Sequence, residues 1–169
     1  MAEYVVLVDE NDNEIGTEEK MKAHVDGKLH RAFSIFVYNS KGDLLLQQRE
    51  SSKYHCGGLW TNTCCSHPRK GEELANAVHR RLNEEMGFDC ELKEKFSFLY
   101  KAEFDNGLTE NELDHVFVGF SDITPKINPE EVENYKWITI TNLKKDIANN
   151  PNSYTPWFKI ALQKLNENM

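Results

Sequence analysis

The chain has 169 residues, which is enough for one domain with a sizeable core and too few for two comfortable ones. Its formal net charge is −8, so broad contacts with nucleic acid or an anionic membrane are not expected, and an anionic substrate would need a local cluster of cations or a metal. No basic, apolar leader is visible, no apolar run reaches the length of a membrane span, and the four cysteines fit a reducing compartment. We therefore expect a cytoplasmic protein in which residues 1–169 form a single domain, as a monomer or a weak homodimer.

The apolar pattern predicts more strands than helices. In chain order, the predicted strands and extended runs cover residues 4–8, 29–38, 44–48, 59–66, 92–103, 110–120 and 135–140. The predicted helices cover residues 72–86, 141–148 and 156–166. One helix lies in mid-chain and two end it, which favours an α/β (α+β) fold with a mixed sheet covered by helices.

The helix predicted over 72–86 carries charge on its apolar face. At about 100° per residue, Glu85 falls between Leu74 and Val78, and Arg81 lies at the edge of the same stripe. A charge that faces a core is costly unless it is paired or binds a metal. Two interpretations stay open: an internal Arg81–Glu85 salt bridge, or a polar pocket that both side chains line.

The extended run at 59–66 ends in a cysteine pair and a histidine. Alternation places Thr63, Cys65 and His67 on one face and Cys64 on the other. A cysteine beside a histidine is a candidate reactive thiol, although a buried cysteine near an incidental histidine would give the same pattern.

Two further patterns suggest a metal. Glu110 and Glu112 share one face of a strand, which is tolerated either in solvent or around a cation. His24 and His30 lie six residues apart, which is weak evidence taken alone. Together with His67, they would nevertheless complete an imidazole and carboxylate set suited to Mn²⁺, Fe²⁺ or Zn²⁺.

These features together resemble the type 1 isopentenyl-diphosphate delta-isomerases. The resemblance covers nearly the whole chain, and 66–88 is similar to a degraded Nudix box. In that box Ser66 stands where a glycine is usual and Arg81 where a glutamate is usual, and the isomerase branch also carries arginine there. The most specific elements are Ala23-His24, Leu29-His30, Leu59-Trp60-Thr61-Asn62, Cys65-Ser66-His67-Pro68, Tyr100 with Glu110-Asn111-Glu112, and Thr155-Pro156-Trp157.

The resemblance implies a Nudix-type sheet between helices and the interconversion of isopentenyl and dimethylallyl diphosphate in isoprene biosynthesis. It implies that Cys65 and Glu112 are the acid/base groups, with Tyr100 assisting, and that Trp157 faces the hydrocarbon end. It implies diphosphate contacts from Lys20, Arg49, Lys53 and Arg81. It implies a Mg²⁺ bound through Glu85, and one transition metal held by His24, His30, His67, Glu110 and Glu112.

Two other functions are compatible with parts of this pattern. A Nudix pyrophosphatase would cleave a nucleoside or other diphosphate with Mg²⁺, but Arg81 in place of glutamate and the Cys65/Glu112 pair count against it. A metal-dependent binding module would not need acid/base chemistry at every such position.

Overall fold

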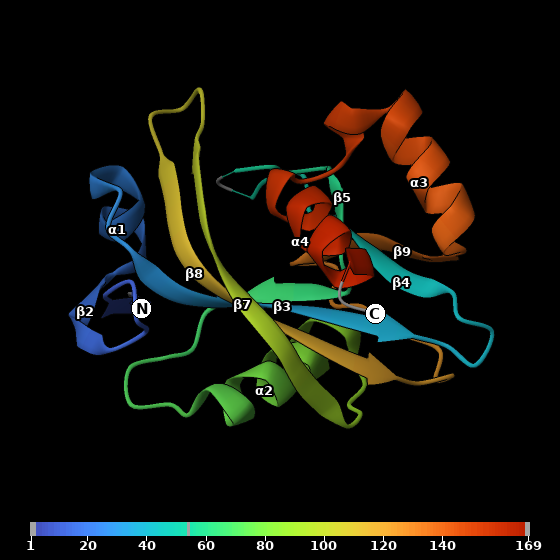
Figure 1. Ribbon diagram of the computed structural model, residues 1–169, viewed down its shortest axis with the longest axis horizontal. Coiled ribbons are helices and arrows are strands. Elements are labelled where there is room, and N and C mark those ends of the chain that lie inside the picture. The colour runs from blue at the N-terminus through green and yellow to red at the C-terminus, as the bar shows by residue number, and fades with distance from the viewer. Residues whose placement is uncertain (1–2, 54, 168–169) are drawn as a thin grey trace.

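The structure is a computed structural model and describes residues 3–53 and 55–167. Within these residues, alternating apolar side chains build a mixed nine-stranded sheet (Figure 1). The strands are β1 (Tyr4–Val8), β2 (Glu14–Glu19), β3 (His30–Tyr38), β4 (Leu44–Arg49), β5 (Trp60–Thr61), β6 (Cys64–Ser66), β7 (Leu92–Glu103), β8 (Thr109–Phe120) and β9 (Val132–Ile138). The helices are α1 (Lys20–Asp26), α2 (Leu74–Met86), α3 (Ile140–Asn149) and α4 (Pro156–Glu167), with a 3₁₀ turn at Pro151–Ser153.

Strand β3 lies at the centre of this sheet and is buried along most of its length. It pairs in parallel with β8 along one edge, and its other edge meets β1, β6 and β4. Helix α2 covers one face of the sheet, while α3 and α4 lie on the opposite side (Figure 1). Both faces of β3 are therefore covered, as a strand with apolar residues at successive positions requires.

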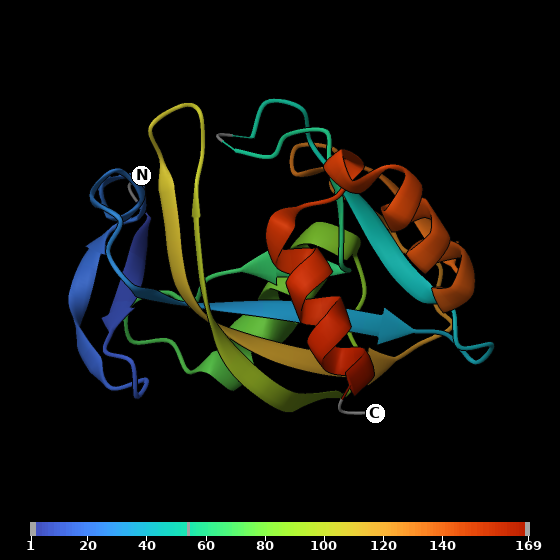
Figure 2. The ribbon, with the colours of Figure 1, turned by 45° about the horizontal axis from the view of Figure 1, so that its top comes forward.

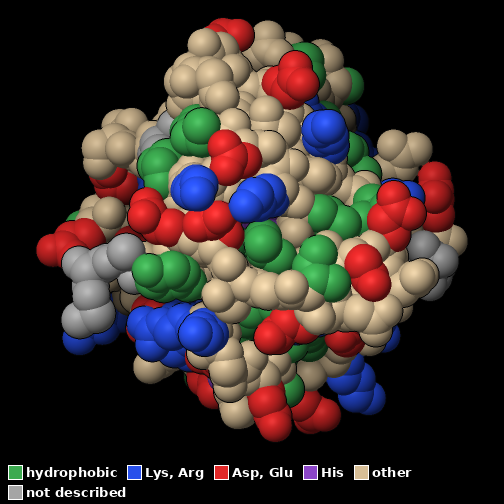
Figure 3. Space-filling view, turned by 90° about the vertical axis from the view of Figure 1, so that its left-hand side faces the viewer, with side chains coloured by type: hydrophobic (Ala, Val, Ile, Leu, Met, Phe, Trp, Pro, Cys, Tyr) green, Lys and Arg blue, Asp and Glu red, His purple; other side chains and the backbone are tan. Residues whose placement is uncertain are grey.

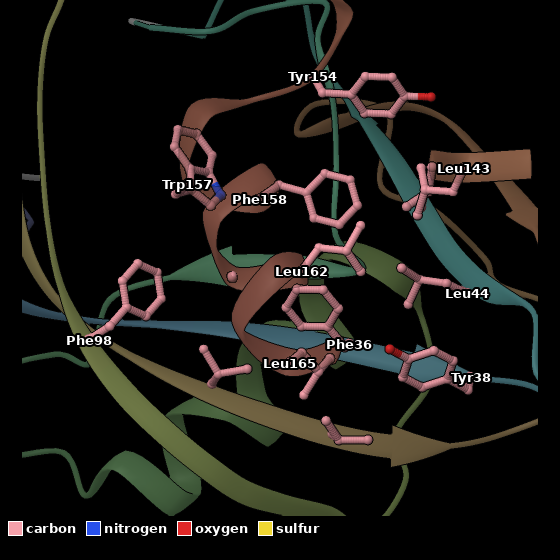
Figure 4. Close-up of a cluster of buried hydrophobic side chains, with 14 of the residues drawn as sticks. Phe36, Tyr38, Leu44, Phe98, Leu143, Tyr154, Trp157, Phe158, Leu162 and Leu165 are labelled. Carbon is pink, nitrogen blue, oxygen red and sulfur yellow. The ribbon is translucent and has the colours of Figure 1, made fainter. Parts of the chain in front are cut away.

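Alternation along β3 divides the core into two clusters. Phe33 and Ile35 pack with Val78 and Leu82 of α2, and the next residue, Phe36, packs with residues of α4 on the other side. Figure 4 shows the second cluster, which joins residues of the sheet to α3, α4 and the segment before α4. Its labelled members are Phe36, Tyr38, Leu44, Phe98, Leu143, Tyr154, Trp157, Phe158, Leu162 and Leu165.

The predicted fold class is confirmed, and the differences are local. Strand β2 and helix α1 were not predicted, because their exposed polar residues hide the periodicity of both elements. The run predicted at 59–66 was wrong as one strand, because the chain turns at Asn62 and Thr63 between β5 and β6. The Thr63 hydroxyl donates to the Leu45 carbonyl at 2.7 Å and accepts from the Val37 amide at 2.9 Å, so Thr63 belongs to the sheet and not to a site.

The surface around the N-terminal hairpin carries charges of both signs. Lysine and arginine side chains lie among aspartates and glutamates on the face in Figure 3, with no broad basic area. Among the described residues, no helix has the length and apolar character needed to cross a membrane.

Gly87, which ends α2, supplies a test of how this helix is held. Its φ is +72°, and a Cβ there would lie 2.2 Å from the backbone oxygen of Lys126. Gly87→Ala should therefore lower the free energy of unfolding by several kcal/mol, through both left-handed strain and a backbone clash. Gly42 has a φ of +83° with nothing within 4 Å of the added Cβ, so Gly42→Ala should cost only about 1 kcal/mol. Urea unfolding of both variants measures the difference, and equal losses would contradict the packing argument.

Candidate active site

The register of three neighbouring strands places the first functional side chains in one row. His30 at the start of β3 lies opposite Glu112 on β8, and Glu112 lies opposite Tyr100 on β7. Two residues along each strand, the next row holds Ala32, Asp114 and Phe98. Side chains of one row point to the same face, so the sheet itself brings an imidazole, a carboxylate and a phenol together.

Three histidines surround Glu112. Candidate ligand atoms of His24, His30, His67 and Glu112 all lie within 4.8 Å of one another, a spacing that could hold a divalent metal ion. His67 Nε2 lies 2.8 Å and His30 Nε2 lies 3.3 Å from Glu112 Oε2. Helix α1 supplies His24 and stops at Gly27, so the chain reverses and the His24 and His30 rings come to 5.0 Å, centre to centre. Four of the five predicted transition-metal ligands are thus gathered in one cluster.

The orientation of the rings suits metal binding. The Nδ1 atoms of His24 and His30 lie 2.7 and 2.9 Å from the carbonyl oxygens of Lys20 and Lys28. An Nδ1–H that donates to a carbonyl leaves the Nε2 lone pair free for a metal. His30 Nε2 is buried and makes no well-formed hydrogen bond to any described residue. These donors fit a divalent transition metal.

Burial and mutual repulsion set the charge of this cluster. Burial lowers the pKa of His24 and, together with neighbouring His30, takes the pKa of His67 well below its ordinary value. Burial opposes ionisation of Glu112, but His30 and the other groups beside it together outweigh burial and lower the pKa of the carboxyl. His24 and His67 are thus neutral imidazoles beside an ionised Glu112, which are the protonation states of metal ligands. Burial opposes protonation of His30, but the neighbouring Glu112 carboxylate raises the pKa of this imidazole.

Glu110, the fifth predicted ligand, is buried beside the cluster. Its Oε1 atom contacts Nε2 of His55, a residue in the connection between β4 and β5. Because Glu110 and Glu112 are 3% and 6% exposed, the interpretation of the pair as a solvated strand face is wrong. His55 was not among the predicted site residues, because only the folding of a distant loop brings it to this strand.

Asp114 is a further carboxyl that the sequence analysis missed. It lines a cleft together with Glu110 and Glu112. Its Oδ2 accepts a hydrogen bond from Ser34 at 2.8 Å, and its Oδ1 is buried without a hydrogen bond to the described residues. Burial, and then Glu112, hold the pKa of Asp114 well above its ordinary value. The alternation that paired Glu110 with Glu112 extends to position 114 and could have identified it.

Cys65 lines the same cleft as Glu112 and lies four residues farther along β3 in the strand register. Strand β6 places it beside Ser34, on the edge of β3 opposite to β8. Its Sγ donates to Asn62 Oδ1 at 3.0 Å and accepts from Trp157 Nε1 at 3.0 Å. Burial, and then Asp114, raise the pKa of the Cys65 thiol to about 12, so the group is a protonated thiol. Cys64 points the other way and donates to Glu85 at 3.3 Å, as the predicted alternation requires.

Aromatic rings enclose the space between these two groups. In Figure 4 the side chains of Trp157 and Phe158 point in different directions from the start of α4, and both belong to the buried cluster. The Trp157 ring meets Tyr100 edge-on at 6.4 Å and His55 edge-on at 5.7 Å. The Tyr100 hydroxyl is buried without a hydrogen bond to the described residues, and burial, then Glu110, raise its pKa.

The charged pair of α2 is present and has additional partners. Arg81 contacts Glu85 and also Glu131, and its Nε donates to the Ser66 hydroxyl at 2.9 Å. Glu85 is 4% exposed and accepts from Gln47 at 3.0 Å. The predicted i,i+4 salt bridge therefore exists, and both residues also line the cleft, so the two interpretations are compatible in this state.

One cleft of about 840 Å³ joins these groups. The predicted site residues that line it are Lys20, Arg49, Lys53, Cys65, His67, Arg81, Glu85, Glu110, Glu112 and Trp157. Lys20 lies 3.3 Å from Glu3, and Lys53 lies 3.5 Å from Glu131. The Arg49 guanidinium lies 5.3 Å from the centre of the Trp157 ring. The cations gather at this cleft, which meets the need for local positive charge in an acidic chain.

Comparison with known proteins agrees with this geometry. The NUDIX domain model matches residues 28–158. Isopentenyl-diphosphate Delta-isomerase 2 of Aromatoleum aromaticum is 52% identical over 98% of this chain and 87% of its own length. The protein of the same name from Photorhabdus laumondii is 55% identical over 98% of this chain and 93% of its own length. A Deinococcus radiodurans crystal structure, 20% identical and covering 95% of this chain and 98% of its own, superposes with a TM-score of 0.78, which bears on the fold alone. The chain belongs to the type 1 isopentenyl-diphosphate delta-isomerases, a family with the NUDIX domain.

Proposed function

We propose that this enzyme interconverts isopentenyl diphosphate and dimethylallyl diphosphate in isoprenoid biosynthesis, through protonation at one carbon and deprotonation at another. The observation that carries the proposal is the position of Cys65 and Glu112 on opposite edges of β3, at one cleft, in opposite protonation states. An allylic shift needs a proton donor and a proton acceptor in either direction. A protonated thiol and an ionised carboxylate supply one of each.

The surroundings of the pair fit a carbocation intermediate. The face of an aromatic ring stabilises a desolvated cation by about 2 kcal/mol, and Trp157 lies next to the Cys65 sulfur. Tyr100 lies beside Glu112 in the strand register, where it would assist proton transfer at that carboxylate. The buried aromatic walls exclude water, which would otherwise trap the cation.

The metal cluster would hold the carboxylate end of this pair. His24, His30, His67, Glu110 and Glu112 are the proposed ligands of one Mn²⁺, Zn²⁺ or Fe²⁺ ion. Such an ion supplies positive charge and Lewis acidity when it is bound. The residues of this chain fix Glu112 between two imidazoles, so that its carboxylate has a set position for proton transfer.

The diphosphate would occupy the charged end of the cleft. Lys20, Arg49, Lys53 and Arg81 would contact it, and Glu85 would bind a Mg²⁺ that neutralises its charge. Arg81 and Lys53 both pair with Glu131 in the structure, so a bound diphosphate would compete with Glu131 for these two cations.

The first prediction tests the reaction and its thiol together. Purified protein incubated with isopentenyl diphosphate and Mg²⁺ should form an acid-labile allylic product. Cys65→Ala should lower kcat by about a hundredfold or more, as expected for the loss of an acid/base group. Cys64→Ala, which removes a thiol from the opposite face, should retain most of the activity. Phosphate release from nucleoside diphosphates without allylic product, or a dead Cys64→Ala beside an active Cys65→Ala, would overturn the assignment.

The second prediction concerns metal content. The protein should carry about one tightly bound transition-metal ion per chain besides exchangeable Mg²⁺, because imidazoles favour Zn²⁺, Mn²⁺ or Fe²⁺. His30→Ala should lose most of this metal, and His79→Ala should keep it, since His79 pairs with Asp89 outside the cluster. Elemental analysis after gel filtration measures both, and equal metal content in wild type and His30→Ala would remove His30 from the site.

The third prediction separates substrate binding from a structural salt bridge on α2. Arg81→Leu should raise KM about 30-fold, because a charged hydrogen bond to buried phosphate contributes about 2 kcal/mol. Glu85→Gln should raise the Mg²⁺ concentration needed for half-maximal rate. Arg31→Leu is the control, because Arg31 pairs with Asp12 away from the residues that line the cleft and should affect only stability. Unchanged kinetics in Arg81→Leu and Glu85→Gln, together with lowered melting temperatures, would show that the pair is structural only.

A further inference from the structure

The connection between β4 and β5, residues 50–59, brings one side chain to the metal cluster from outside the sheet. Its base is closed by backbone hydrogen bonds, from the Arg49 amide to the Leu59 carbonyl at 2.8 Å and from the Gly58 amide to the Arg49 carbonyl at 2.9 Å. Gly57 is packed so tightly that a Cβ would lie 2.4 Å from the Ser51 carbonyl oxygen. The described part of this loop therefore has a fixed shape, which allows a residue within it to hold a set position.

His55 is the residue that this loop delivers. Its side chain is 3% exposed, and its Nε2 contacts Oε1 of Glu110, whose side chain is 4% exposed. The guanidinium of Arg49 donates to the His55 carbonyl oxygen at 3.4 Å. The loop and the β7–β8 hairpin lie side by side above the sheet in Figures 1 and 2, so this contact joins two segments far apart in the sequence.

Aromatic neighbours fix the plane of the His55 ring. Its centre lies 5.1 Å from that of Phe104, next to the β7–β8 turn, and 5.7 Å from that of Trp157, the ring that donates to Cys65. The four ligand atoms that lie within 4.8 Å of one another do not include one from His55 or Glu110. The His55 ring also lies 5.9 Å, centre to centre, from that of His24, and Glu110 lies two residues before Glu112 on β8, so His55 and Glu110 together flank the cluster.

We infer that His55 is a positioning residue, which holds one oxygen of Glu110 and thereby presents the Glu110 carboxyl to the metal. A carboxylate ligand that is itself hydrogen-bonded keeps its orientation, and loss of such an outer partner costs about 10- to 100-fold in metal affinity. The same ring braces Trp157, so one loop residue supports both ends of the acid/base pair. The inference rests on the metal centre and the reaction proposed above.

Two substitutions separate the hydrogen bond from the ring. His55→Phe keeps an aromatic ring against Phe104 and Trp157 but loses the contact with Glu110. His55→Gln loses the ring but places an amide nitrogen near the position of Nε2. His79→Ala is the control for removal of a histidine that pairs with a carboxylate at the surface. Thermal melts in the presence of a chelator show that each variant is folded before metal is added.

The measurement is the dissociation constant for Zn²⁺, by competition with a chromophoric chelator, together with the visible spectrum of the Co²⁺ form. His55→Phe should bind Zn²⁺ about 10- to 100-fold more weakly than wild type and change the Co²⁺ spectrum. His55→Gln should recover most of the affinity, and His79→Ala should match wild type. Wild-type affinity in His55→Phe, or an equal loss in His55→Phe and His55→Gln, would overturn the role of His55. Failure of wild type to bind Zn²⁺ or Co²⁺ at all would instead overturn the proposed metal centre.

Discussion

The parallel pairing of β3 with β8 is the constraint on which the site depends. It sets His30 opposite Glu112, and the antiparallel pairing of β8 with β7 adds Tyr100 to the same row. Because side chains alternate between faces, a slip of one residue would turn Glu112 to the opposite face of the sheet and put Leu113 in its place. Apolar residues farther along both strands, Phe33 and Ile35 on β3 and Phe117 on β8, pack against α2 and fix this register. The stability of the core and the geometry of the site are thus one property of the sheet.

The two faces of the sheet carry different polar groups, just as they carry different parts of the apolar core. On the α4 face, alternation carries the row of Glu110, Glu112 and Asp114 into the apolar cluster that begins at Val116. On the other face, Cys64 and Gln47 hydrogen-bond to Glu85 of α2. Strand β6 presents its two cysteines to the two sides, Cys65 to Trp157 and Cys64 to Glu85, the carboxylate that pairs with Arg81. Buried charges are costly unless each is paired, and the structure pairs Glu110 and Glu112 with imidazoles and Glu85 with a guanidinium group.

The period of the apolar residues was sufficient to predict the strands and helices that carry a continuous apolar stripe. The roles of the site residues came from the resemblance to the isomerase family. The strands around Phe36 and Val116 and the helix from Leu74 to Met86 were predictable because their buried positions repeat at the strand or helix period. β2 and α1 were not, because exposed polar side chains dominate both. The misplaced charge of Glu85 was visible from its helix face alone, whereas His55 was not, since its contact with Glu110 arises between a loop and a hairpin. Sequence thus indicates what a face contains, and only the fold shows which faces meet.

In the proposed site, the β3–β8 register, together with α1 and the segment after β6, builds a metal centre beside Cys65 and Glu112. Anomalous diffraction at the zinc absorption edge, from crystals grown with Zn²⁺, tests it most directly. If this metal centre exists, we expect one strong peak at about 2.0–2.2 Å from the Nε2 atoms of His24, His30 and His67 and from a carboxylate oxygen of Glu112. A zinc-saturated crystal with no peak among these residues, or with the ion held by other side chains, would contradict it.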